Sequence, residues 1–245
     1  METPKRIDIR SLTLAELQTQ LMAFGEPGFR AKQVYQWLWE KTCTNFDEMS
    51  NLSKSLRETL KTQFEICAVK IHQSQISEDR TIKNSFKLYD GNLVEGVLIP
   101  TTERMTACVS SQVGCSLTCK FCATGYMDRK RNLNADEIFD QVVLIAKQAE
   151  QNYKLALSNI VYMGMGEPLL NYANVLRSIE RITAEDGLNM SYKRITVSTA
   201  GPAQLLNATK VSGRTSGGLG IGVIALIFPQ IMGVGYDSIN AALHG

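Results

Sequence analysis

The first 65 residues place apolar side chains at helical spacing, and this pattern predicts three short helices. Thr13 and Glu16 have the spacing of a capping box at the start of the first helix. The glycines in segment 25–28 end that helix, a second helix is expected from near Phe29, and a third from about Asp47. Together they predict a compact helical module. The apolar stripe of the first helix consists of Leu14, Leu17, Leu21 and Met22.

The spacing of apolar residues then changes from the helical to the strand period. Segments 70–77, 81–89 and 93–100 alternate apolar and polar residues, as strands do. Asp90, Gly91 and Asn92 form a hairpin turn signal between the last two segments. We therefore expect antiparallel strands after the helical module.

From Met105 onward, predicted strands alternate with predicted helices. The strands are 105–111, 158–164 and 194–201, and the helices are 135–150 and 172–183. This alternation indicates βα units and a parallel sheet. In such sheets ligands bind at the carboxyl ends of the strands, so the loops that follow these strands are the first place to look for a site.

Composition narrows the classes of protein that fit. The chain has 245 residues, 44% of them hydrophobic, with 26 Lys and Arg against 24 Asp and Glu. These values exclude collagen and long disordered tails, and the small net charge predicts no acidic partner. No apolar signal segment follows METPKRIDIR, so we expect a cytoplasmic protein whose six cysteines are thiols or metal ligands.

The cysteines are the strongest chemical signal. Cys115, Cys119 and Cys122 form a C-x3-C-x2-C triplet in the loop after a predicted strand. Iron–sulfur cubanes normally take four cysteines, so three thiolates leave one iron open, as in enzymes that bind S-adenosylmethionine (SAM) there. A zinc site with Cys108 as fourth ligand, and plain reduced thiols, are the alternatives. Isolated Cys43 and Cys67 are expected to be buried in the core.

Longer motifs around the triplet extend this interpretation. The runs TACVSSQVGCSLTCKFCATG, VYMGMGEPLLN and ITVSTAG closely resemble the radical-SAM dual-specificity RNA adenine-C2 methyltransferase family (RlmN/Cfr). FRAKQVYQWLWEK and NFDEMSNLSKSLR resemble the accessory helical domain of that family. The resemblance implies an α/β fold: a partial radical-SAM (βα)6-type barrel with about three βα units, preceded by a small helical domain.

The resemblance also implies a division of the chain into four parts. Residues 1–65 would be the helical accessory domain, which contacts RNA, and residues 66–103 a β-hairpin connector. Residues 104–201 would be the N-terminal half of the radical-SAM barrel. Residues 202–245, with only 3 charged side chains, would be an unrelated Gly-rich apolar tail.

Within the core, the resemblance assigns ligands to both cofactors. It implies that Cys115, Cys119 and Cys122 hold a 4Fe–4S cluster. It implies that SAM is bound through Gly166, Glu167 and Ser198. From the residues alone, the GMGEP segment would be a strand-end turn and Ser198 an ordinary strand serine.

Two further residues receive catalytic roles from the resemblance. Glu95 lies inside an apolar strand segment, where a carboxylate most simply points to solvent; the family equivalent accepts a proton from the substrate adenine. Cys108 would by pattern be a core thiol; the family equivalent resolves a protein–RNA intermediate by forming a disulfide.

The implied activity is methylation of C2 of an adenine in 23S rRNA and in the anticodon loop of tRNA, with a reductant such as flavodoxin or ferredoxin and no stable membrane partner. The residues do not choose between rRNA and tRNA, or between C2 and C8. A non-catalytic RNA-binding module with a zinc- or cluster-stabilised cysteine loop is the alternative. The basic side chains beside the cluster either contact phosphate or form a solvated loop; they are Lys120, Arg129, Lys130 and Arg131.

The last part of the chain departs from the family pattern. The family transfers its methyl group through a C-terminal cysteine, and no cysteine follows Cys122 in these 245 residues. We therefore expect this chain not to complete the reaction. The uncharged segment 217–235 has nearly the length of a membrane span, but its glycines and Pro229 make a poor helix. A foreign tail is the favoured interpretation, with a membrane anchor or a divergent end of the barrel as alternatives.

Overall fold

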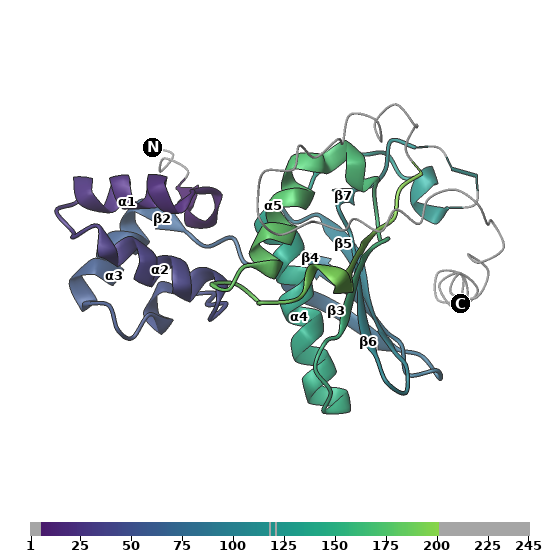
Figure 1. Cartoon of the computed structure of the whole chain (residues 1–245). Coiled ribbons are helices and arrows are strands. Elements are labelled where there is room, and N and C mark those ends of the chain that lie inside the picture. The colour runs from purple at the N-terminus through teal and green to yellow at the C-terminus, as the bar shows by residue number, and fades with distance from the viewer. Residues whose placement is uncertain (1–5, 118, 121, 201–245) are drawn as a thin grey trace.

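A computed structural model describes residues 6–117, 119–120 and 122–200 of the chain (Figure 1). Its N-terminal part, residues 7–65, contains three α-helices, two short 3-10 helices and a pair of two-residue strands. The predicted tail, residues 202–245, lies outside the described residues. The elements of the N-terminal part are β1 (Ile7–Asp8), α1 (Leu14–Ala23), α2 (Phe29–Trp39), α3 (Lys54–Gln63) and β2 (Phe64–Glu65).

The local sequence explains where these helices begin. Thr13 caps α1 and forms the predicted capping box with Glu16. The third helix begins at Lys54, not at Asp47, because Ser53 accepts a hydrogen bond from the Leu56 amide and starts it there. Residues 46–48 form a separate 3-10 turn. Met22, predicted in the apolar stripe of α1, is exposed.

A six-stranded sheet lies at the centre of the rest of the described chain, with strand order β10-β9-β6-β5-β4-β3. Strands β3 to β6 pair antiparallel, and β6, β9 and β10 pair parallel. The antiparallel strands predicted as a connector therefore continue the same sheet as the predicted βα units. The elements are β3 (Lys70–Ile76), β4 (Ile82–Lys87), β5 (Leu93–Pro100), β6 (Met105–Val109), β9 (Asn159–Tyr162) and β10 (Ile195–Val197), with the helices α4 (Ala135–Tyr153) and α5 (Tyr172–Thr183).

The two faces of this sheet differ. Helices α4 and α5 pack together on one face (Figure 1), where Phe86, Leu98 and Ala107 are fully buried. Gly96 belongs to this face, because a Cβ there would lie 2.6 Å from the Phe86 ring and 3.4 Å from Ile145 of α4. On the opposite face the side chains of β5 and β6 are half-buried or exposed. We call this second face the open face.

The N-terminal part is joined to the sheet domain by a buried arginine. Arg10 pairs with Asp140 at 2.7 Å, Asp136 at 3.4 Å and Asp8 at 3.6 Å. Beside it the rings of Trp39 and Phe139 meet edge to face, with centroids 5.1 Å apart. The joint therefore combines aromatic packing with one cation among three carboxylates.

Two expectations concern the buried cysteines and the membrane. Cys43 is buried as predicted, whereas Cys67 is only half-buried and was wrongly expected in the core.

Residues 6–117, 119–120 and 122–200 contain no helix that is both long and apolar enough to cross a bilayer. The uncharged segment 217–235 lies outside that part of the chain.

Candidate functional site

The cysteine triplet lies on a loop that a short hairpin closes. Strands β7 (Gln112–Val113) and β8 (Arg131–Asn132) pair antiparallel at its base. Gly114 takes a φ of +74° there, and a Cβ at this position would lie 2.2 Å from the Asp128 carbonyl oxygen. Only glycine fits this close approach without strain. The loop between the two strands is called the cysteine loop below.

All three thiols of the triplet stand on this loop. No three His, Cys, Asp or Glu side chains of the described residues converge closely enough to hold a metal ion. Burial raises the pKa of the Cys119 thiol, and the charges of Cys122 and Cys115 raise it further. The charge of Glu167 raises it in the same direction.

The GMGEP segment packs against the strand end that precedes the cysteine loop. The Met165 carbonyl oxygen accepts hydrogen bonds from the amides of Ser111 at 2.9 Å and Gln112 at 3.1 Å. The Gln112 side-chain oxygen in turn accepts from the Glu167 amide at 2.9 Å. Gly166 has a φ of +94°, and a Cβ there would lie 2.4 Å from Cβ of Gln112. The glycine is therefore required by this packing.

The carboxylate of Glu167 is buried and already holds three donors. Its Oε1 accepts from the Leu169 amide at 3.0 Å and from the Thr199 hydroxyl at 2.5 Å, and its Oε2 from the Ala200 amide at 2.9 Å. Ser198, just before these residues, donates its amide to the Tyr162 carbonyl at 3.2 Å. Glu167 thereby links the segments that follow β9 and β10.

Glu95 and Cys108 share the open face. Val97 pairs directly with Cys108 across β5 and β6, and Glu95 is two residues from Val97 on the same side. Glu95 and Cys108 are therefore diagonal neighbours, a separation of roughly 7–8 Å between such positions. The Glu95 side chain is 39% exposed and pairs with Lys83 of β4 at 2.8 Å. Glu95 thus points away from α4.

The Cys108 thiol is protonated in these surroundings. Burial raises the pKa of Cys108 to about 12, with a hydrogen bond from the Met163 main chain acting the other way. All six cysteines lie within the described residues, and none forms a disulfide.

Three of the four basic residues near the cysteine loop have partners within the protein. Arg131 pairs with Asp90 at 2.6 Å and Glu137 at 2.7 Å, and so ties the 89–92 hairpin turn to the start of α4. Lys130 donates to Asn92, and Arg129 donates to Asn132. Arg131 therefore helps to hold the base of the cysteine loop through contacts within the protein. Lys120 is exposed on the loop.

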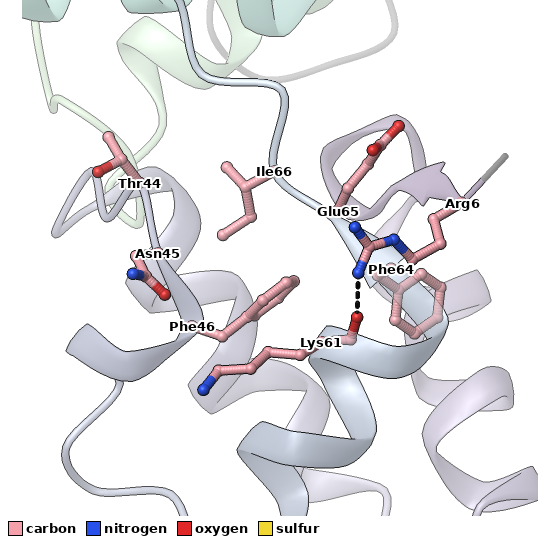
Figure 2. Close-up of a pocket in the computed structure, with 8 residues that line it drawn as sticks. All are labelled: Arg6, Thr44, Asn45, Phe46, Lys61, Phe64, Glu65 and Ile66. Atoms are coloured by element: carbon pink, nitrogen blue, oxygen red, sulfur yellow. Dashed lines mark hydrogen bonds between the residues drawn. The ribbon is translucent and has the colours of Figure 1, made fainter. Parts of the chain in front are cut away.

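A cavity of about 320 Å³ lies elsewhere, in the N-terminal part (Figure 2). Arg6 donates there to the carbonyl oxygen of Lys61, whose ammonium group pairs with Asp47. None of the predicted site residues lines this cavity. It is lined by Arg6, Thr44, Asn45, Phe46, Lys61, Phe64, Glu65 and Ile66.

Sequence reasoning missed several residues that build the site. Ser110, Gln112 and Thr199 hold the GMGEP segment through their side chains. Each follows the end of a strand of the parallel part of the sheet, so the strand-end rule could have found them. Gln141 of α4, which holds Ser110 through both of its main-chain groups, carries no such signal.

The cysteine loop suits an iron–sulfur cluster in donor type and number. Thiolates are the usual protein ligands of such clusters, and three thiols that form no disulfide stand within eight residues. Gly125 allows the loop to fold on itself, because a Cβ there would lie 2.7 Å from the Cys119 carbonyl oxygen. The residues present therefore fit a cluster with three protein ligands.

Comparison with known proteins agrees with this geometry. Residues 7–66 match the family model "Ribosomal RNA large subunit methyltransferase N-terminal domain", and residues 109–209 match the model "Radical SAM superfamily". The crystal structure of a radical SAM methyltransferase from Sphaerobacter thermophilus superposes with a TM-score of 0.74 and 40% sequence identity. That match covers 82% of this chain and 59% of the solved chain.

Curated relatives narrow the family further. A probable dual-specificity RNA methyltransferase RlmN from Cytophaga hutchinsonii is 60% identical over 202 residues, which are 82% of this chain and 55% of the relative. Another, from Christiangramia forsetii, is 53% identical over 82% of this chain and 57% of the relative. The chain spans about half the length of the curated relatives it matches.

The fold and the cysteine loop define a radical SAM protein with a partial α/β barrel, as predicted. Within that superfamily the chain belongs to the RlmN family of RNA methyltransferases, which confirms the resemblance seen in its motifs. Members of both groups use a 4Fe–4S cluster and SAM.

Proposed function

We propose that residues 6–200 are the cofactor-binding part of a methyltransferase that acts on C2 of an adenine in RNA. The observation that carries the proposal is the meeting of the cysteine loop, the GMGEP segment and the residues after β10 at one edge of the parallel strands. Glu167 of the GMGEP segment accepts from the Ala200 amide after β10 and donates its own amide to Gln112 at the base of the cysteine loop. Cys115, Cys119 and Cys122 would hold the cluster. When bound, the cluster supplies the electron that cleaves SAM to a carbon radical.

Gly166, Glu167 and Ser198 would contact SAM. Glu167 is a suitable partner for the SAM amino group because it is a buried carboxylate whose main chain is bonded to Gln112 at the base of the cysteine loop. Three of its acceptor positions are taken by protein donors. A carboxylate has about four such positions, which leaves one for the ligand.

Glu95 would accept the C2 proton of the adenine, and Cys108 would be the resolving thiol. Their shared place on the open face supports both assignments. Cys108 would have to lose its proton before it attacks a sulfur, because its pKa is about 12. No cysteine follows Cys122 in these 245 residues. We infer that they bind the cofactors but do not by themselves complete methyl transfer.

The proposed partners are 23S rRNA, tRNA and a one-electron reductant such as flavodoxin or ferredoxin, in the cytoplasm and without a stable membrane partner. The helical N-terminal part is the proposed RNA contact. Its match to a ribosomal RNA methyltransferase domain supports this role.

Anaerobic reconstitution of the chain with iron and sulfide tests the cofactor assignment. We expect about four irons per chain and SAM retention in equilibrium dialysis. Cys119→Ser should abolish both, whereas Cys67→Ser, which lies far from the loop in sequence, should change neither. Zinc binding without iron would instead favour a non-catalytic RNA-binding module. Methylated adenine formed by these 245 residues with SAM and reductant would contradict the inferred inactivity.

A further inference from the structure

The main-chain ladder between β5 and β6 stops just short of Glu95. The two strands pair from Pro100 and Met105 to Val97 and Cys108. Continuing the same antiparallel register brings Glu95 opposite Ser110, one residue beyond the end of β6. At this position a side-chain hydrogen bond replaces the main-chain hydrogen bond of the ladder: the Ser110 hydroxyl donates to the Glu95 carbonyl oxygen at 2.5 Å.

Met165 of the GMGEP segment completes the connection. Its thioether sulfur accepts the Glu95 amide at 3.4 Å, and its own amide donates to the Ser110 hydroxyl at 2.8 Å. Glu95, Met165 and Ser110 therefore form a closed ring of three hydrogen bonds. Both main-chain groups of Glu95 are held within this ring.

Further contacts fix the position of Ser110 and of the GMGEP segment within this ring. Ser110 is fully buried, and Gln141 of α4 accepts from its amide at 2.9 Å and donates to its carbonyl oxygen at 3.2 Å. A Cβ on Gly164 would lie 2.7 Å from the Ser110 hydroxyl, so the GMGEP segment sits directly on the serine. A displacement of this segment therefore reaches Glu95 through two hydrogen bonds.

We propose that Met165 and Ser110 are positioning residues for Glu95, which they fasten to the segment that carries Gly166 and Glu167. This inference rests on the proposed function, in which Glu95 accepts a proton and that segment contacts SAM. A proton acceptor must lie within hydrogen-bond reach of the atom it serves, so its main chain has to be fixed relative to the cofactor. Lys83, bonded to the Glu95 carboxylate, then directs the side chain.

The choice of methionine allows a sharp test. A thioether sulfur is a weak acceptor, and leucine has a similar volume but accepts no hydrogen bond. Met163 lies two residues before Met165, just outside the GMGEP segment, and is 51% exposed. Met163→Leu is therefore a matched control for Met165→Leu.

The experiment follows the Glu95 amide by nuclear magnetic resonance in the uniformly 15N-labelled chain without cofactors. Met165→Leu should speed exchange of the Glu95 amide hydrogen about two- to fivefold, the effect of losing one weak hydrogen bond of about 0.5–1 kcal/mol. It should also weaken the Lys83 ammonium signal that reports the pair with Glu95. Met163→Leu should leave both signals unchanged, and selenomethionine at all positions should preserve them because selenium still accepts.

Ser110→Ala provides a second variant that breaks the same ring from the other side, and it should alter the Glu95 amide signal as well. Equal Glu95 exchange in Met165→Leu and Met163→Leu would overturn the inference, as would an unchanged Lys83 signal in Met165→Leu. Iron content and SAM retention are measured separately on the same variants. A wild-type chain that binds neither cofactor would contradict the proposed function, while the comparison of Met165→Leu with Met163→Leu would still decide the positioning roles.

Discussion

The amide of Ala200 donates to Oε2 of Glu167 at 2.9 Å, so one buried carboxylate joins the end of the third parallel strand to the loop after the second. The same carboxylate also accepts from Thr199 and Leu169. Residues that are more than thirty positions apart are thus held at one edge of the sheet. This contact makes Glu167 part of the framework of the site as well as a candidate for contact with SAM.

Glu167→Gln should therefore destabilise the folded chain even without cofactors. In the variant an amide nitrogen, which only donates hydrogen bonds, replaces one of the two carboxylate oxygens. At least one of the donors that Glu167 accepts from then loses its acceptor and faces another donor. We expect the free energy of unfolding to fall by about 1–3 kcal/mol, measured by urea denaturation. Glu103→Gln, in an exposed turn, is the control and should change it by less than about 0.5 kcal/mol. Equal midpoints for the two variants would show that the three contacts of Glu167 contribute little.

Arg10→Met should be among the most destabilising substitutions outside the site. Arg10 is 3% exposed and faces Asp8, Asp136 and Asp140. Its removal leaves the buried Asp136 and the half-buried Asp8 and Asp140 without their cation, a loss of about 3–5 kcal/mol in the free energy of unfolding.

A second substitution separates the charge effect from lost packing. Asp140→Asn added to Arg10→Met removes one of the unpaired charges and should restore part of the stability in a double-mutant cycle. Arg129→Met, at an exposed arginine, is the control. A double variant that is no more stable than Arg10→Met alone would argue against the electrostatic explanation.

Asp136 should make the chain less stable as the pH rises toward neutrality. Burial raises the pKa of Asp136 to about 7, with Arg10 opposing this shift and Asp8, Asp140 and Glu137 adding to it. In the unfolded chain the same carboxyl ionises near the ordinary aspartate pKa of 3.8. Between these two values the folded state binds more protons, so the free energy of unfolding decreases as the pH rises from about 4 through 7.

Asp136→Asn tests this slope, because asparagine does not titrate. The loss of stability between pH 4.5 and 7.5 should be smaller in the variant than in the wild-type chain, as measured by denaturation at a series of pH values. Parallel curves for the two proteins would mean that Asp136 is ionised in the folded state throughout this range.

Asp90 should produce the opposite dependence at lower pH. Its hydrogen bond with Arg131 lowers the pKa of Asp90 well below the ordinary aspartate value of 3.8, and its bonds with Asn92 add to the effect. The stabilisation is therefore present above about pH 4 and is lost as the pH falls below that value. Asp90→Asn should be less stable than the wild-type chain at pH 6, and the difference should shrink at pH 3. A difference that stays constant over this range would contradict the prediction.

Local signals in the sequence predicted much of the fold. The capping box of Thr13 and Glu16 needs two residues three positions apart, and it formed as expected. The start of the third helix was placed too early, because the acidic and apolar residues of 46–48 form a separate 3-10 turn that Asn45 caps. The spacing of apolar residues does not reveal which of two nearby capping residues begins the α-helix.

The candidate site was only partly predictable for a different reason. The rule that ligands bind at the carboxyl ends of parallel strands predicted that the loops after β6, β9 and β10 lie at one edge of the sheet. The contacts that fix these loops join residues far apart in sequence, such as Glu95 with Met165 and Ser110 with Gln141. Neither pair has a spacing or a composition that marks it, so only the folded chain reveals them.

Comparing Gly166 with Gly91 separates two costs of replacing a glycine, namely backbone strain at positive φ and a steric clash of the new Cβ with its neighbours. Both have positive φ, +94° and +81°, so alanine at either position strains the backbone by about 1 kcal/mol. At Gly91 a Cβ would meet nothing within 4 Å, whereas at Gly166 it would lie 2.4 Å from Cβ of Gln112 and 2.8 Å from its amide nitrogen. Gly166→Ala must therefore also displace the GMGEP segment from the strand end.

We expect Gly91→Ala to lower the free energy of unfolding by about 1 kcal/mol and Gly166→Ala by about 2–4 kcal/mol, since overpacking adds to the strain. Urea denaturation of the two variants measures the difference. Because the Gln112 side chain accepts from Glu167, the displacement in Gly166→Ala should also weaken SAM retention after reconstitution, while Gly91→Ala should retain SAM like the wild-type chain. Equal stability and equal SAM retention in the two variants would show that the GMGEP segment tolerates a side chain against Gln112.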